Sequence, residues 1–543
     1  MLILHTTINK QKGRLKGETV SGQVNSVALQ VSFSDEWAEY TRYAVFTKDG
    51  YSEKVLLDAN DFCRFPNVFL ADEGDVEIGF VGEKTDNSGA EIQYVSKPML
   101  FRIRPGTITD AESAEESLVP DLISRMAADI ASETDAVADY AFYRYSGLES
   151  VNLPKVKAVG AYAFAECADL TTVKLPEAEV IGEYAFHFSG VREIDLPKVS
   201  QLGEYACYSC ESLESVVLPS VQEIGDYAFS GCSALKTAVC PELKTIGDYA
   251  FSSDPALTAV TAPMVEEIGR NAFHSDTALQ TADYPQCRTV GTYAFSKCEN
   301  LKRVNLPQLR TAGNYAFDHC SSLTSFSAPN LTEGAAYMFN YCSSLRSVEL
   351  PQVTVVKANM FDYCTILSTV RLGKVTSIES TAFRGCHGLI TADFPLVTSL
   401  PQSAFNSCSL LRYLDFPNAE TLGSSVFAYC YNIRELIFPK ATTVGWGAFQ
   451  YCDLLKRADF PVAEKIDSYC FRRCDALETL IIRTPAVAQL VNKNALQNTL
   501  IADGTGYIYV PSALVETYKT TTNWVTYASQ FRAIEDYPRV TEV

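Results

Sequence analysis

The residues from 142 onward repeat one pattern with a period of 22, F-x-x-C-x-x-L-x-x-V-x-L-P-x-x-x-x-I-G-x-Y-A, which slips only once, in a unit of 21. In stacked-repeat architectures of this period, one unit cannot bury its own apolar face and must pack on its neighbours. We therefore predict one solenoid of sixteen units instead of several globular domains. The Phe position falls at residues 142, 164, 186, 229, 251, 273, 295, 317, 339, 361, 383, 405, 427, 449 and 471, with Cys207 in the remaining place.

The segment before each proline alternates in the way that a half-buried strand requires. Leu170, Val173 and Leu175 point to one side, and Thr172 and Lys174 point to the other. Proline ends the strand because it cannot donate a hydrogen bond to the ladder. The I-G-x-Y-A-F segment then returns the chain, with glycine permitting the tight turn and phenylalanine filling the core. Each unit is expected to contribute one short parallel strand.

Residues 216–235, VVLPSVQEIGDYAFSGCSAL, resemble the BspA-like, Treponema-type leucine-rich repeat. The resemblance covers residues 135–480 and is specific, because sixteen copies stay in register. It implies a curved or twisted solenoid that serves adhesion or partner binding rather than catalysis. It carries no particular ligand, because ligands vary widely among such proteins.

Twelve of the seventeen cysteines lie three residues after the Phe position. Stacked about 4.8 Å apart with parallel side chains, they are poorly placed for disulfide bonds. Ser189, Asp254 and Asp276 replace cysteine at the same position, which a paired disulfide would not tolerate. We predict a ladder of buried, reduced thiols that behave as small apolar groups. Its members are residues 167, 210, 232, 298, 320, 342, 364, 386, 408, 430, 452 and 474.

No motif points to catalysis, a metal or a cofactor. The metal-like pair Cys207 and Cys210 combines a Phe position with a thiol-ladder position, and so does Cys470 with Cys474, so neither pair predicts a metal site. There are five histidines and no phosphate-binding, hydrolase or zinc-protease motif. A net charge of −20 argues against nucleic acid as a partner. No run of about 18 apolar residues predicts membrane insertion.

Positions that vary between repeats are free for recognition. The two outward positions of each strand vary, and the later ones are richer in acidic and aromatic residues, including Asp393, Tyr413 and Asp415. This strand-lined face is one candidate binding surface.

A second variable position lies between the Phe and Cys positions, where tyrosines gather late in the array. Tyr429, Tyr431 and Tyr451, together with Trp446, form the leading candidate binding cluster. Aromatic rings at repeat spacing suit sugar faces or protein hot spots. The alternative is ordinary edge packing between neighbouring coils.

Both ends depart from the repeat. Residues 1–106 contain strand-like segments separated by turn residues and predict an antiparallel β-sandwich. This region loosely resembles N-terminal attachment domains of phage baseplate and tail proteins. Residues 481–543 predict an α/β cap, with Trp524 in its core.

Residues 107–134 read as an acidic linker followed by a short helix. Leu118, Leu122, Met126 and Ile130 form one stripe of that helix. The stripe either packs on the first repeat or forms the seam of a homo-oligomer.

The leading hypothesis from sequence is a non-enzymatic receptor-binding component of a phage tail or baseplate. Residues 1–106 would dock to tail or baseplate proteins, and the solenoid would bind a host-surface protein or glycan. No export signal is visible, and free thiols suit assembly in a reducing cytoplasm before incorporation into a virion. The alternative is a BspA-like adhesin that is secreted or carried on a bacterial cell surface.

Overall fold

The computed structural model describes the strands between residues 2 and 103, and then residues 135–145 and 147–537. The chain divides into two compact units, Met1–Met126 and Ala127–Val543. The linker and its stripe of Leu118, Leu122, Met126 and Ile130 lie outside the described residues. Packing on the first repeat and an oligomer seam therefore both stay predictions.

The first unit contains two β-sheets. Among the described strands, every pair is antiparallel except β1 with β3, which run parallel, and the predicted packing of the two sheets as a sandwich stays a prediction. One sheet has the order β2 (Lys12–Lys16), β1 (Leu2–Asn9), β3 (Val27–Phe33), β6 (Phe62–Phe65). The other has the order β5 (Tyr51–Leu56), β4 (Thr41–Lys48), β7 (Gly74–Thr85), β8 (Glu91–Val95), and β9 (Met99–Ile103) also pairs with β7.

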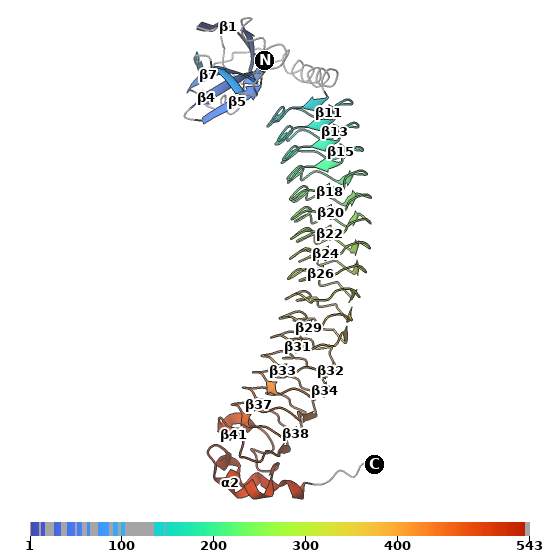
Figure 1. Ribbon diagram of the computed structural model, residues 1–543, viewed down its shortest axis with the longest axis vertical. Helices are drawn as coiled ribbons and strands as arrows, with labels where there is room; N and C mark the ends of the chain where they lie inside the picture. The colour runs from blue at the N-terminus through green and yellow to red at the C-terminus, as the bar shows by residue number, and fades with distance from the viewer. Residues whose placement is uncertain are drawn as a thin grey trace, which may run out of the picture. The chain divides into compact units, whose positions relative to one another are not determined.

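The second unit is the predicted solenoid, and its longer strands stack in a parallel row of about 18 turns (Figure 1). In many of these strands the outward residues are exposed and the middle residue is buried in the core, as in Ser150–Asn152. The row comprises β11 (Ser150–Asn152), β13 (Thr172–Lys174), β15 (Glu193–Asp195), β17 (Ser215–Val217), β19 (Thr237–Val239), β21 (Ala259–Thr261), β23 (Thr281–Asp283), β25 (Arg303–Asn305), β27 (Ser325–Ser327), β28 (Ser347–Leu350), β30 (Thr369–Leu372), β32 (Thr391–Asp393), β34 (Tyr413–Asp415), β36 (Glu435–Ile437), β38 (Arg457–Phe460), β40 (Thr479–Ile482), β42 (Tyr507–Val510) and β43 (Phe531–Ala533).

A second row of two-residue strands was not predicted from the sequence. These strands coincide with the I-G segment of the repeat, and Figure 1 shows the two rows on different sides of the solenoid, most clearly between β29 and β38. The row comprises β10 (Ala136–Val137), β12 (Ala158–Val159), β14 (Val180–Ile181), β16 (Gln201–Leu202), β18 (Glu223–Ile224), β20 (Thr245–Ile246), β22 (Glu267–Ile268), β24 (Thr289–Val290), β26 (Thr311–Ala312), β29 (Val355–Val356), β31 (Ser377–Ile378), β33 (Ser399–Leu400), β35 (Thr421–Leu422), β37 (Thr443–Val444), β39 (Lys465–Ile466) and β41 (Gln489–Leu490).

The remaining side of each coil is a stacked turn. Its backbone is hydrogen-bonded to the next coil, as where the Phe229 amide donates to the Ala250 carbonyl at 2.8 Å. Two residues per turn adopt the left-handed conformation, for example Tyr162 with φ of 55° and Glu166 with φ of 57°. The stacked turns therefore add backbone hydrogen bonds between neighbouring coils on a third side of the solenoid.

The phenylalanine ladder fills the core. Phe295, Phe317 and Phe339 are fully buried, and their rings stack with centroids 5.3 and 5.8 Å apart. Each repeat therefore buries its largest side chain against the same residue of the two adjacent repeats.

The cysteine ladder is buried as predicted, and the sixteen described cysteines are free thiols. Each ladder thiol donates a hydrogen bond to the carbonyl of the Phe position one coil earlier, as Cys320 does to Phe295 at 3.1 Å and Cys342 to Phe317 at 3.1 Å. Burial raises the pKa of Cys167 to about 12. The ladder thus packs the core and also uses a second lone pair of a buried carbonyl.

We predict that denatured protein kept anaerobic without reductant will titrate with close to seventeen thiols. The native protein should leave the sixteen buried thiols unreactive toward a thiol reagent at pH 8, because burial excludes the reagent. Thiol counts before and after denaturation check this. A count near five in the denatured state would mean that the ladder is disulfide-linked.

The solenoid is closed at its C-terminal end by α2 (Val515–Thr520) and four 3-10 helices, η3 (Lys493–Leu496), η4 (Ser512–Leu514), η5 (Trp524–Gln530) and η6 (Ile534–Asp536). The strand row continues into this cap, since β42 pairs with β40 and β43 pairs with β42. Trp524 is fully buried and donates to the Ala488 carbonyl at 2.7 Å, so it belongs to the core of the cap.

Candidate functional site

The long-strand row is interrupted after β21, β25 and β34, and also between β30 and β32. Strands β30 and β32 are not paired, whereas β28 pairs with β30 and β32 pairs with β34. In the intact β32–β34 pair, the Arg412 amide donates to the Ile390 carbonyl at 2.9 Å and the Phe394 amide donates to the Asp415 carbonyl at 3.0 Å. One coil earlier, the equivalent bonds would join the Ile390 amide to the Ser368 carbonyl and the Leu372 amide to the Asp393 carbonyl. Within residues 147–537, neither of these two bonds is formed.

The interruption after β30 also uncovers side chains at core positions. Val370, Leu372 and Phe394 are half-buried here. At the interruption after β25, the residues equivalent to Leu372 and Phe394 stay buried, namely Leu306 and Ala328. Leu372 and Phe394 are therefore more exposed than their equivalents at that interruption.

Gly373 replaces the proline that ends the strand in other repeats. The Gly373 amide donates to the Val353 carbonyl at 3.2 Å, a bond that proline cannot make. In other repeats, the amide two residues after the proline donates to the carbonyl of the residue that precedes the proline, as the Val397 amide does to the Phe394 carbonyl. At Gly373 the equivalent amide, that of Val375, donates to the Gly373 carbonyl instead, at 2.9 Å. The end of β30 is thus held toward the coil before it and away from β32.

We predict that Gly373→Val lowers the free energy of unfolding by about 1–3 kcal/mol. A Cβ atom at this position would lie 2.6 Å from the Pro351 carbonyl oxygen, so the strand end would have to move. Urea unfolding of the solenoid measures the effect. The matched change Pro417→Val, at the same repeat position two coils later, should cost less than about 1 kcal/mol. Equal costs at the two positions would show that close packing is not what distinguishes Gly373.

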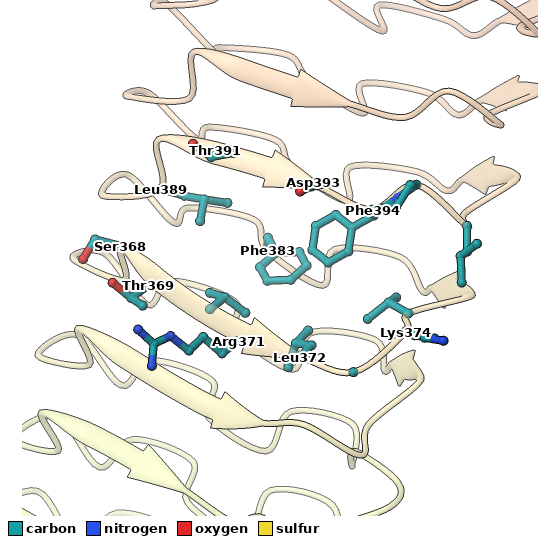
Figure 2. Close-up of a pocket in the computed structure, with 15 residues that line it drawn as sticks. Ser368, Thr369, Arg371, Leu372, Lys374, Phe383, Leu389, Thr391, Asp393 and Phe394 are labelled. Atoms are coloured by element: carbon teal, nitrogen blue, oxygen red, sulfur yellow. The ribbon is translucent and has the colours of Figure 1, made fainter.

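The space between β30 and β32 is a slot of about 550 Å³. Its floor includes Phe383 and Phe394, whose rings lie between the two strands in Figure 2. Arg371 and Lys374 line the β30 side, and Asp393 lines the β32 side. All three of these charged side chains are exposed, and none forms an ion pair with another described residue. The slot therefore combines an apolar floor, two unpaired cations and one unpaired carboxylate.

The predicted strand-face residues lie at this slot or beside it. Asp393 lines the slot, and Tyr413 and Asp415 lie on the neighbouring strand, in register with Thr391 and Asp393. Tyr413 is 56% exposed. The Arg412 guanidinium lies 5.4 Å from the centre of its ring. The structure thus brings these three residues together, while their role in binding stays a prediction.

The predicted aromatic cluster divides into two parts. Tyr429 and Tyr451 stack with centroids 4.7 Å apart, and Tyr431 meets Tyr429 edge to face at 6.4 Å. Trp446 contacts Tyr469 instead, at 5.8 Å. The stacking of Tyr429 on Tyr451 covers one face of each ring, and whether these rings bind a partner or only pack between coils stays a prediction.

Sequence comparison between repeats did not single out Arg371, Leu372 or Phe394. They occupy ordinary repeat positions, and only the geometry of the gap makes them accessible. The available signal was Gly373, the single replacement in the proline series.

Two further properties bear on the kind of site. Across the residues that the structure describes, no group of three or more metal-ligating side chains comes together. No helix in the same residues is long and apolar enough to cross a membrane.

Comparison with known proteins gives one family and several similar structures. The family model described as "BspA type Leucine rich repeat region (6 copies)" matches residues 135–258, 266–390 and 354–478, together more than half of the chain. A leucine-rich repeat protein from Bacteroides ovatus is 22% identical over 63% of this chain and 91% of its own, with a TM-score of 0.42. A leucine-rich cell surface protein from Faecalibacterium prausnitzii is 21% identical over 58% and 90%, with a TM-score of 0.36. No curated protein matches.

Proposed function

Because the chain belongs to the BspA-type leucine-rich-repeat family, we propose that it is a recognition protein displayed on a bacterial cell surface, where its solenoid binds a partner protein. The slot between β30 and β32 is the single observation that carries the binding role. It exposes apolar core positions beside unpaired charges, the combination that interface centres use. Solenoids of this family are typically non-enzymatic, and their extended surfaces suit binding.

The slot and the adjoining strand face give the proposed binding surface. Tyr413 and Asp415 extend it onto β34, next to Asp393. Tyr431 and Trp446, 40% and 44% exposed, mark a second surface for the same class of partner. The comparisons add no support for the phage tail or baseplate component that the sequence favoured.

The experiment is surface labelling of the producing bacterium with antibody raised against residues 135–537. We expect intact cells to be labelled and mild external protease to remove the label. Beads coated with the full chain should adhere to host cells. Label confined to phage particles, with unlabelled cells, would overturn the surface assignment in favour of the phage alternative.

The adhesion assay also locates the surface. The triple change Asp393→Ala, Tyr413→Ala, Asp415→Ala is expected to reduce bead adhesion. The matched change on the other candidate surface, Tyr431→Ala with Trp446→Ala, is expected to reduce it less. The reverse order would move the binding surface to the aromatic cluster.

A further inference from the structure

We propose that the slot between β30 and β32 binds an extended peptide strand of a partner protein that carries a carboxylate side chain. The strand would lie between the two unpaired strand edges. The inference rests on the proposed function, for which it names the chemical class of the partner.

The backbone of the slot supports a strand as the occupant. On the β30 wall, the Ser368 carbonyl and the Leu372 amide lack the ladder partners that equivalent groups have in intact coils. On the β32 wall, the Ile390 amide and the Asp393 carbonyl lack theirs. Each wall thus offers one donor and one acceptor, as do the walls of the interruptions after β25 and β34, but only here are the core side chains at the strand ends, Leu372 and Phe394, half-buried instead of buried. An added strand satisfies such groups along its whole length, as in strand-addition complexes.

The floor of the slot fits alternate side chains of that strand. Successive side chains of a strand point to opposite faces, so every second one would face the solenoid core. Val370, Leu372 and Phe394 are half-buried there, and apolar side chains of the ligand would complete their burial. The other side chains of the ligand would face outward, along the rim of the slot.

Charge at the rim selects an acidic ligand. The chain as a whole carries a net charge of −20, yet Arg371 and Lys374 both line the β30 wall without an ion pair among the described residues. Figure 2 shows these two side chains toward opposite ends of β30, so a ligand carboxylate beside either one would form charge-assisted hydrogen bonds. Asp393 on the opposite wall would repel a carboxylate there, so the acidic residue is fixed to the β30 side.

A glycan fits this slot less well than a peptide. Sugars bind to free aromatic ring faces, but the ring of Phe383 stacks between Phe361 and Phe405, with centroids 5.2 and 5.1 Å away. Both faces of Phe383 are therefore covered. The exposed backbone edges favour a peptide instead.

The test measures binding of fluorescein-labelled octapeptides to the full chain by fluorescence polarisation. The panel alternates valine and threonine and places one glutamate at each position in turn. Each peptide is paired with a lysine counterpart and with a copy N-methylated at alternate amides. We expect saturable binding by a glutamate peptide, with about tenfold weaker binding by its lysine and N-methylated forms. Failure of every glutamate peptide to bind at roughly 1 mM overturns the proposal.

Charge reversal supplies the matched variants. Arg371→Glu with Lys374→Glu should weaken the glutamate peptide about tenfold and strengthen its lysine counterpart. Lys174→Glu reverses a cation at the same strand position as Arg371, in an intact part of the ladder, and should leave binding unchanged. Peptide binding should also slow hydrogen exchange at the Leu372 and Ile390 amides. Binding without that protection would place the peptide outside the slot and overturn the strand insertion.

The outcomes separate this inference from the proposed function. If the parent chain adheres to host cells and the charge-reversed chain adheres equally well, the peptide site is overturned while the surface role stands. If the parent neither labels the cell surface nor adheres, the proposed function itself is wrong. Concentration-dependent self-association that the peptide blocks would make a second copy of this chain the occupant, which also overturns the proposal.

Discussion

Replacing Phe317 by alanine is expected to lower the free energy of unfolding of the central coils by about 3–5 kcal/mol. Phe317 is fully buried, and its ring lies between those of Phe295 and Phe339 and 5.0 Å from that of Phe326. The alanine would leave a cavity that adjacent coils cannot fill, because backbone hydrogen bonds fix the spacing of the coils on each side. Urea unfolding measures the total cost.

Hydrogen exchange shows where the loss falls. Since each coil contacts only its neighbours, protection should fall first in the coils that carry Phe295, Phe317 and Phe339, and least at the two ends. Phe188→Ala is the matched control, because that ring is 50% exposed and its removal leaves no core cavity. A uniform loss of protection along the whole array would contradict nearest-neighbour stacking.

The double change Asp254→Cys, Asp276→Cys is expected to stabilise the solenoid above neutral pH by about 1–3 kcal/mol for each carboxyl. The two aspartates replace thiols in the cysteine ladder and are fully buried in adjacent coils. The Asp254 amide donates to one Asp276 carboxylate oxygen at 2.8 Å, and the other three carboxylate oxygens lack hydrogen-bond partners among the described residues. Cysteine at both positions restores the donor that the rest of the ladder uses.

The pH dependence follows from the direction of the pKa shifts. Desolvation, and for Asp254 also the Asp276 charge, raises the pKa of both carboxyls well above the ordinary range. The titratable groups that face them are the Cys232 and Cys298 thiols and the Tyr284 hydroxyl. The folded chain therefore holds protons that the unfolded chain releases above about pH 4.

The stability that the protonated carboxyls of Asp254 and Asp276 contribute is fully present below about pH 4. It is lost as the pH rises through the pKa values that these carboxyls have in the folded chain. The stability gained by the double variant should therefore grow as pH rises. Urea unfolding of parent and variant between pH 4 and 9 measures this difference. Asp503→Cys, at an exposed carboxyl, is the control and should show a constant difference. A constant difference for the double variant would mean that the two acids are ionised at no cost in the fold.

The sequence by itself determined the repeat, the in-register Phe and Cys ladders, the exposed outward positions of the long strands and the place of Trp524 in the cap. Each follows from a local rule that every coil obeys: a strand alternates, proline ends it, and a stacked unit buries the same side chain as its neighbour. The second row of short strands was not predicted, because a two-residue strand is too short to show a recognisable alternation of apolar and polar residues. Their pairing becomes visible only when the coils are stacked.

Only the tertiary structure decided where the solenoid opens. Gly373 was visible in the sequence as the one replacement in the proline series, but its consequence depends on the Val353 carbonyl that its amide meets and on the Pro351 carbonyl that excludes a Cβ atom. Likewise, Arg371 and Phe394 have ordinary repeat positions, and only the stacked coils bring them together as lining residues of one slot. The repeat pattern can be recognised within the sequence of a single coil. A gap between coils depends on contacts between residues of adjacent coils, so the sequence of one repeat does not predict it.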